Sequence, residues 1–405
     1  MTKKTAEVSA QYEAYPYPER NPEDERKRLI TGSPSHPLEI DHHVFAGLRD
    51  WNKPLRVLVA GGGTGDGLIQ IAQVMKSANR TCHITYVDMS RAACEIAKER
   101  AKVRGLECRF VIGSLLDAPE MGPFDYIDCC GVLHHLPDPQ QGFDALAQAL
   151  APDGGLGFMV YAPYGRSGVY PLQEAFGALL RDLPPKEKLA KAKAIFKRIP
   201  KSHPFRLNPH LSDHQASDAG FYDLLLHAQD RPYTVGQLLD SLERAGLALS
   251  GFTQPALYDP APFLLEGMAA PDCPKQRMEL AEKLRGSLRL HVGYAVRAGK
   301  QDKSCANGTN PALVPHLKGV AAPALAAQIE RKGRVGLTLG PEKEYLELPK
   351  KSAPLIARID GRTSLANIAK ALGMDPISFN AAWAPVHKGL GGYGVLLYSG
   401  LISAG

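Results

Sequence analysis

Runs of branched apolar residues alternate, over the first 160 residues, with stretches in which apolar side chains recur at helical spacing. The run 55–60 has the composition of a parallel strand buried on both faces, and glycines follow it at once. Leu68, Ile71 and Met75 then fall close to helical intervals. The pattern predicts a strand, a glycine turn and a helix in succession, with free backbone N–H groups at the junction.

Further strands are expected to begin near residues 82, 108, 124 and 156, with helical patterns between them. Strands that alternate with helices form a parallel sheet, because each connection crosses over one face. We therefore expect an α/β fold with a doubly wound, mostly parallel, Rossmann-like sheet. Ligands of such sheets bind at the carboxyl ends of the strands.

The glycine turn reads Gly61-x-Gly63-x-Gly65. Its third glycine comes one residue too early for the dinucleotide pattern, and no Gly-Lys-Ser/Thr follows, which argues against a nicotinamide oxidoreductase and a P-loop enzyme. Asp88 ends the second strand about 20 residues past a glycine turn, where an acid can accept hydrogen bonds from both ribose hydroxyls. It can also cap the helix that begins near Ser90.

The order of these pieces resembles that of the class I S-adenosylmethionine-dependent methyltransferases over about residues 38–162. The resemblance rests on Val57–Gly65, Val87-Asp88, Gly113–Asp117, Phe124-Asp125, Gly131-Val-Leu-His-His-Leu136 and Pro152-Asp-Gly-Gly155. An arm with the pattern Tyr-x-x-Tyr-Pro-Tyr-Pro, starting at Tyr12, is similar to that of some bacterial members.

The resemblance implies S-adenosylmethionine as the cofactor. The glycine loop would lie against its methionine end, Asp88 would hold the ribose, and Met89 would lie beside the adenine. The cofactor-binding residues so implied are Gly61, Gly63, Gly65, Asp66, Asp88, Met89, Ser114, Leu115 and Gly131. Asp66 would meet the cofactor ammonium or cap the following helix.

Two positions depart from the family pattern. Val59 stands where an acid usually precedes the first glycine, and Ser114 stands where an acid usually contacts the adenine amino group. The Ser114 hydroxyl or Asp117 is expected to substitute for the second acid. These departures affect the affinity for the cofactor more than its identity.

A sulfonium methyl group is already a strong electrophile, so the protein mainly has to align a nucleophile and exclude water. His134 and His135 follow the fourth strand and are the candidate catalytic bases; the alternative is that one packs and the other caps or faces solvent. We expect the substrate to meet Tyr15, Tyr17, Tyr164 and Arg166. The alternatives are an arm that merely packs on the core and a solvated loop at 161–170.

The chain divides by composition into several regions. We expect an N-terminal arm and helix (1–50), a cofactor-binding core (51–164), a mostly helical substrate lid (165–260), the end of the methyltransferase domain (261–299), a polar linker (300–311) and a small α+β domain (312–405).

The last region has a winged-helix-like pattern. Its candidate reading helix, 377–388, offers only Asn380, His387 and Lys388 to bases, which favours contact with a protein or a second copy over DNA.

Composition limits the possible partners, the cellular location and the state of the cysteines. The 405 residues carry a net charge of +6, which permits an acidic partner without demanding one. Apolar runs are far shorter than the roughly 20 residues that cross a bilayer, and Met1–Thr5 leads into no signal segment, so a cytoplasmic location is expected. The seven cysteines form no C-x-x-C pair and suit reduced thiols, and no metal site is expected.

These observations predict an enzyme that transfers a methyl group from S-adenosylmethionine to a small-molecule acceptor. Two alternatives stay open. The acceptor can be a protein side chain such as lysine, or the chain can be a non-catalytic regulator that senses S-adenosylmethionine and acts through its C-terminal domain.

Overall fold

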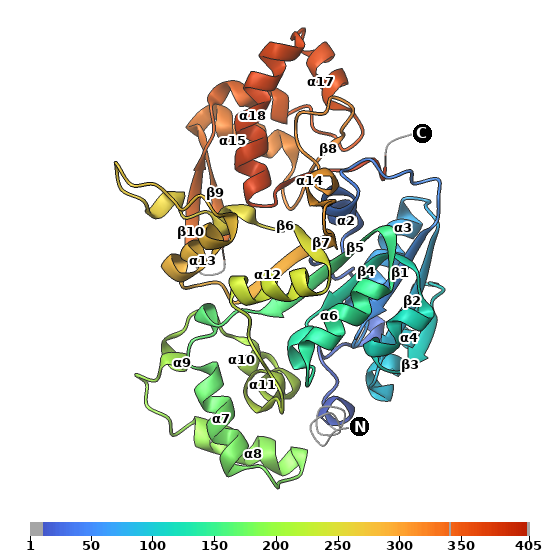
Figure 1. Cartoon of the computed structure of the whole chain (residues 1–405), viewed down its shortest axis with the longest axis vertical. Helices are drawn as coiled ribbons and strands as arrows, with labels where there is room; N and C mark the ends of the chain where they lie inside the picture. The colour runs from blue at the N-terminus through green and yellow to red at the C-terminus, as the bar shows by residue number, and fades with distance from the viewer. Residues whose placement is uncertain (1–10, 340–341, 403–405) are drawn as a thin grey trace.

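The computed structural model describes residues 11–339 and 342–402, and a seven-stranded sheet forms their centre in the order β3-β2-β1-β4-β5-β7-β6 (Figure 1). The strands are β1 (Leu55–Ala60), β2 (Cys82–Asp88), β3 (Arg109–Ile112), β4 (Phe124–Cys130), β5 (Leu150–Tyr161), β6 (Leu247–Phe252) and β7 (Leu290–Arg297). The first five are parallel, and β7 runs antiparallel to both of its neighbours. The expected Rossmann-like sheet is confirmed.

Helices cover both faces of the sheet, as the apolar pattern requires. On one face, Ile40, Leu68 and Ala97 belong to the same buried cluster as the β1 side chains Leu55 and Val57. These three residues come from α2 (Pro37–Val44), α3 (Asp66–Ser77) and α4 (Arg91–Val103). The other face is covered by α5 (Ala118–Met121), α6 (Pro139–Gln148) and α12 (Val235–Arg244).

Strand register places the functional turns side by side. Ala60 lies opposite Val87 in the β1–β2 ladder, so Gly61 and Asp88 follow at the same carboxyl edge. The backbone N–H of Gly61 donates to the carbonyl of Val87 at 2.8 Å. Val59 lies opposite Asp128 in the β1–β4 ladder. Parallel pairing therefore brings the glycine loop, the end of β2 and the loop after β4 to one edge of the sheet.

The region after β5 is a helical insert with its own small core. It contains α7 (Val169–Leu179), α8 (Pro185–Phe196), α9 (Pro204–Leu207), α10 (Asp213–Ala216) and α11 (Asp218–Leu226). Figure 1 shows it beside the N-terminal arm and at the opposite end of the molecule from the C-terminal region. The lysine-rich helix α8 ends at Phe196, since Pro200 and Pro204 lack the N–H groups that would continue it.

The C-terminal region packs around a second core that includes Ile356, Trp383 and Leu390. Its elements are α15 (Ala322–Lys332), α16 (Ala353–Ile356), α17 (Leu365–Ala371), α18 (Pro376–Gly392) and the short antiparallel pair β8 (Pro315–Leu317) and β11 (Leu396–Tyr398). A β-hairpin follows α15 and consists of β9 (Arg334–Leu339) and β10 (Glu342–Glu347). The sequence pattern revealed neither β8 nor α15.

Residues 300–311, expected to be a linker, lie against α2. They contain the single-turn helix α14 (Gln301–Ser304), which follows α13 (Pro274–Arg285) and β7 along the chain. The N–H of Ala46 donates to Ser304 and the N–H of Ala306 donates to His42, both at 2.7 Å. Backbone hydrogen bonds thus join the C-terminal region to the sheet domain.

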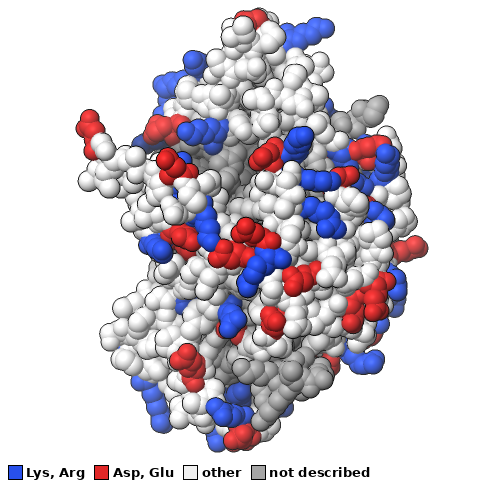
Figure 2. Space-filling view, in the orientation of Figure 1, with Lys and Arg blue, Asp and Glu red and all other residues white. Residues whose placement is uncertain are grey.

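Two further features of the structure concern charge and hydropathy. Acidic and basic side chains are interspersed over the face drawn in Figure 2, without a large area of one sign. Among the described helices, none is long and apolar enough to span a bilayer.

Candidate active site

The three glycines after β1 all have positive φ, at +68° for Gly61, +51° for Gly63 and +98° for Gly65. There is also no room for a side chain at Gly61, because a Cβ there would lie 2.6 Å from Cγ2 of Val132. L-residues with side chains rarely adopt this conformation. The loop therefore needs glycine for its conformation, and it ends at Gly65, the N-cap of α3.

Asp88 connects the end of β2 to the glycine loop. Its Oδ2 accepts a hydrogen bond from the N–H of Gly63 at 2.8 Å, and its Oδ1 accepts one from the N–H of Ser90 at 2.8 Å. The N-cap of α4 is the Ser90 hydroxyl, which accepts from Ala93. Burial raises the pKa of Asp88, while these N–H groups oppose the increase. Each oxygen keeps a lone pair for a further donor such as a hydroxyl.

The N-terminal arm lies across the glycine loop. The Thr64 hydroxyl donates to the carbonyl of Pro18 at 2.7 Å. Asp66, the first residue of α3, forms ion pairs with Arg20 at 2.6 Å and with Arg100 at 2.7 Å. Although burial alone would raise the pKa of Asp66, the bond from Arg20 and the charge of Arg100 bring it below its usual value. The carboxylate of Asp66 thus fixes the arm to α3, a role that neither sequence hypothesis for this residue included.

The remaining cofactor candidates lie around the same edge. The Ser114 hydroxyl accepts from the N–H of Leu116 at 3.1 Å, so it caps a turn after β3, and Leu115 is buried. The N–H of Gly131 donates to Met159, and Met89 directly follows Asp88. The structure thereby gathers the expected cofactor residues at one end of the sheet.

The acid missing at Val59 has a counterpart on the neighbouring strand. Asp128 lies opposite Val59, is 1% exposed, and its Oδ2 has no hydrogen-bond partner among the described residues. Burial raises the pKa of Asp128, the hydrogen bond from Ser35 partly opposes this increase, and the resulting pKa is about 6. Sequence reasoning missed this residue because it resembled an ordinary strand position.

His134 and His135 are both buried in the turn that follows β4. The ring of His134 lies 4.1 Å from that of Tyr161, centroid to centroid, and its two nitrogens have no partner among the described residues. Burial lowers its pKa well below 6.5, so the ring is neutral at pH 7. Nδ1 of His135 lies 2.9 Å from the carbonyl of Gln229; assigned from this contact, Nδ1 carries the proton and Nε2 presents a lone pair.

A network that sequence analysis did not assemble surrounds these histidines. Tyr12 donates to Oδ1 of Asp223 and Tyr161 donates to Oδ2, both at 3.2 Å. Nε2 of His227 lies 3.2 Å from the Tyr12 hydroxyl, and the His227 ring stacks on His135 with centroids 3.8 Å apart. We call Tyr12, His134, His135, Tyr161, Asp223 and His227 the acceptor cluster. The available signal was Asp223 within the apolar part of α11 and His227 at its C-cap.

The four expected substrate residues separate into different environments. Arg166 is 3% exposed and lies against the acceptor cluster, with its guanidinium 3.6 Å from the Tyr161 ring centroid and 3.2 Å from Oδ2 of Asp230. Tyr15 instead stacks on Tyr222 of the insert. Tyr164 is 37% exposed and lines a surface hollow formed with Pro204 and His210, among others.

Tyr17 links the arm to the glycine loop. A Cβ placed on Gly63 would lie 3.0 Å from the Tyr17 carbonyl oxygen. Burial, followed by the charge of Asp223, raises the pKa of the Tyr17 phenol. Tyr17 and Arg166 are therefore near the acceptor cluster, whereas Tyr15 and Tyr164 contact the insert.

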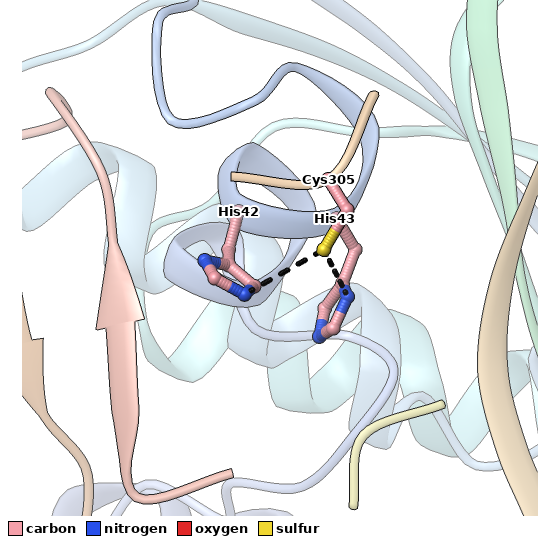
Figure 3. A group of neighbouring side chains, drawn as sticks. All are labelled: His42, His43 and Cys305. Atoms are coloured by element: carbon pink, nitrogen blue, oxygen red, sulfur yellow. Dashed lines mark hydrogen bonds between the residues drawn. The ribbon is translucent and has the colours of Figure 1, made fainter. Parts of the chain in front are cut away.

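Three groups of His, Cys and Asp side chains lie close enough together to be considered as metal ligands. Whether each can bind a metal depends on which ring nitrogens carry a proton and which carboxylates are already paired. In the group drawn in Figure 3, Sγ of Cys305 lies 3.8 Å from Nε2 of His42 and 3.7 Å from Nδ1 of His43. The N–H of Tyr398 donates to Nδ1 of His42, so the proton of this neutral ring is on Nε2, which cannot then ligate a metal. This group instead joins α2 to the C-terminal region.

The other two groups share His135. His227 accepts from the N–H of Gln229 at Nδ1, which places its proton on the nitrogen facing Tyr12. Asp230, in the third group, is already paired with Arg166, whose charge would repel a metal cation. We therefore assign none of the three groups to a metal.

A mostly parallel sheet with a glycine loop after β1 and an acid at the end of β2 is typical of the Rossmann-like fold of the S-adenosylmethionine-dependent methyltransferases. Residues 58–156 match the family model described as a methyltransferase domain. Such a domain takes S-adenosylmethionine as its cofactor.

Two curated relatives match part of the chain. The chain is 33% identical over 267 residues to the uncharacterized protein syc1184_c of Synechococcus, covering 63% of this chain and 62% of that protein. It is 32% identical over 96 residues to the ubiquinone biosynthesis O-methyltransferase of Xylella fastidiosa, covering 23% and 37%. The chain thus spans less than two thirds of either relative.

One solved structure is similar over most of the chain. PKMT2 from Rickettsia typhi gives a TM-score of 0.61 at 14% identity, covering 92% of this chain and 77% of that one. Its complex with AdoHcy gives a TM-score of 0.57 at 15% identity, covering 90% and 76%. At this identity the similarity shows a shared fold, which includes the regions on both sides of the methyltransferase domain.

Proposed function

We propose that this chain transfers the methyl group of S-adenosylmethionine to an acceptor held in the acceptor cluster. The observation that supports this most directly is the adjacency of two sites at one edge of the sheet. The phenol of Tyr12 donates to Oδ1 of Asp223 at 3.2 Å, and the backbone carbonyl of Tyr12 accepts from the hydroxyl of Ser90 at 3.5 Å, while the N–H of Ser90 donates to Asp88. Tyr12 therefore lies between the acid proposed to hold the cofactor ribose and the acid of the acceptor cluster.

The cofactor would be held mainly by backbone groups and by Asp88. The N–H groups of the glycine loop lie where the methionine end would bind, at the N-terminus of a twelve-residue helix. The two oxygens of Asp88 would accept from the ribose hydroxyls. Met89, Ser114 and Leu115 would border the adenine, and Gly131 would leave room beside the methyl group.

The chemistry needs alignment, water exclusion and a proton acceptor. The arm covers the glycine loop and places Tyr12 in the cluster, so little water would reach the sulfonium. The lone pair on Nε2 of His135 is available to take a proton from an acceptor as its nucleophilic atom attacks. His134, neutral and buried, would contribute a donor or acceptor to the bound substrate.

The cluster is enclosed by the arm and the insert, which favours a small molecule or a single extended side chain as the acceptor. The curated relatives carry different acceptors in their names, an O-methyltransferase and a release factor glutamine methyltransferase among them. The chain lacks Asn-Pro-Pro-Tyr after β4, where it reads Cys130-Gly131-Val132-Leu133, and this argues against transfer to an amide nitrogen.

Calorimetric titration with S-adenosylhomocysteine, followed by initial rates with tritiated S-adenosylmethionine and a compound panel, tests the proposal. We expect binding in both cases and transfer to at least one acceptor. His135→Gln should reduce the rate by about 100-fold, on the scale of losing general base catalysis, with cofactor affinity unchanged. His83→Gln is the matched control, since His83 is exposed at the far end of β2. Absence of heat with either cofactor form would contradict the proposal.

A further inference from the structure

Two buried carboxylates near the active site differ in their partners. Asp230 is paired with Arg166 at 3.2 Å and also accepts from Gln173. Asp223 is 4% exposed and accepts from the phenols of Tyr12 and Tyr161. Among the described residues, no lysine or arginine forms an ion pair with Asp223. One acid of the pair is therefore neutralised by a cation, and the other is not.

A buried carboxylate without a cation is costly, and phenol hydrogen bonds at 3.2 Å compensate only part of that cost. The surroundings of Asp223 are suited to a cation. The phenol oxygens of Tyr12 and Tyr161 lie beside its two carboxylate oxygens, and each phenol oxygen keeps lone pairs that can accept from a cationic donor. The one nearby guanidinium, that of Arg166, is already matched by Asp230. A bound cation would complete this site, whereas a bound anion would meet two carboxylates.

We propose that the acceptor atom is the nitrogen of a primary aliphatic amine, which enters as the ammonium ion and pairs with Asp223. The inference rests on the proposed methyltransferase function and specifies its substrate class. The observations that carry it are the uncompensated carboxylate, the phenol oxygens beside it and the position of Tyr12 between Asp223 and Asp88.

The reaction balances without a further reactant. The ammonium ion, paired with the carboxylate of Asp223, gives one proton to the lone pair on Nε2 of His135, the base proposed above, and becomes a neutral amine. The nitrogen lone pair then attacks the methyl carbon, a carbon–nitrogen bond forms, and the carbon–sulfur bond breaks with its electron pair moving to sulfur. The products are a methylammonium ion and S-adenosylhomocysteine. The proton on His135 then passes to solvent as the product leaves.

Such an amine has two sources, a free small molecule or a lysine side chain. We would measure methyl transfer from tritiated S-adenosylmethionine to n-butylamine, to capped lysine and to a short lysine-containing peptide. The matched oxygen probes are n-butanol and the capped lysine analogue with a hydroxyl in place of the amine. Transfer to butylamine and capped lysine at rates near those of the peptide would indicate a small-molecule enzyme, and a strong preference for the peptide would indicate a protein substrate.

Asp223→Asn tests the role of the carboxylate, with Asp240→Asn as the control. Asp240 is an exposed acid on α12 that pairs with Lys275. We expect Asp223→Asn to reduce transfer to amines by about 100-fold, the scale of removing one partner of a buried charge pair. Its affinity for S-adenosylhomocysteine should stay within threefold of the parent protein, which also shows that the variant folds.

Three outcomes would overturn the inference: faster transfer to an oxygen probe than to its amine partner, no transfer to any amine by a protein that binds S-adenosylhomocysteine, or equal amine rates for Asp223→Asn and Asp240→Asn. Failure to bind S-adenosylhomocysteine is a different result. It contradicts the methyltransferase function itself, and the amine inference with it.

Discussion

The backbone N–H of Gly63 donates to Oδ2 of Asp88 across 2.8 Å, and this bond joins the glycine loop after β1 to the end of β2. The two residues are 25 positions apart in the chain, and parallel pairing of β1 with β2 brings them together. A residue that would hold the cofactor ribose is thus fixed by the loop that would hold its methionine end. The two halves of the proposed cofactor site depend on each other.

Replacing Asp88 by alanine should weaken binding of S-adenosylhomocysteine by about 1–3 kcal/mol, the range for losing hydrogen bonds to a charged group. Asp88→Asn should lose less, because one amide oxygen still accepts from Gly63 or a hydroxyl. Isothermal titration calorimetry measures both. Equal affinities for the parent protein and Asp88→Ala would contradict the placement of the ribose.

Gly63→Ala should disturb both the loop and the arm. Gly63 has φ of +51°, and the new Cβ would lie 3.0 Å from the Tyr17 carbonyl oxygen. Strain of this kind costs about 1–3 kcal/mol, so we expect a lower free energy of unfolding and weaker cofactor binding. Chemical denaturation measures the first effect. Gly177→Ala is the control, since a Cβ at this helical position on α7 has nothing within 4 Å.

Arg100→Met should strongly destabilise the protein. The Arg100 side chain is fully buried and connects Glu25 of the arm, at 2.8 Å, with Asp66 of α3, at 2.7 Å. Its removal leaves the buried Glu25 carboxylate with Arg104 alone, and breaking a buried pair costs about 3–5 kcal/mol. Urea denaturation measures the loss. Lys102→Met on the same helix removes an exposed pair with Glu99 and should change stability by less than about 1 kcal/mol.

Asp128 should make stability fall as pH rises from about 4 to 6. Burial raises its pKa in the folded protein to about 6, above the usual 3.8, so the native state binds the proton more tightly than the unfolded chain does. The stabilisation is complete below pH 4 and is lost as pH rises through 6, a change of about 3 kcal/mol by linkage. Asp128→Asn should therefore unfold at higher urea concentration than the parent protein at pH 7.5, with the difference shrinking at pH 4. An unchanged difference between the two pH values would contradict this.

The local sequence pattern was sufficient to predict the fold of the sheet domain. A branched apolar run followed by glycines, and a second run that ends in an acid, are patterns of consecutive residues. Gly61, Gly63, Gly65 and Asp88 could therefore be identified from the sequence alone. The parallel order followed from the alternation of strands and helices. The role of these residues in binding the cofactor stays a prediction.

Contacts between segments far apart in the chain could not be predicted from the sequence. The pairing of Asp66 with Arg20 and Arg100, and the network of Tyr12, Asp223 and His227, join residues 34 to 215 positions apart. No periodicity encodes which polar side chain will face which, because that choice depends on how the arm and the insert pack on the sheet. The sequence determined the fold class and the cofactor chemistry, and only tertiary packing decided which buried carboxylates pair with a cation among the described residues and which do not.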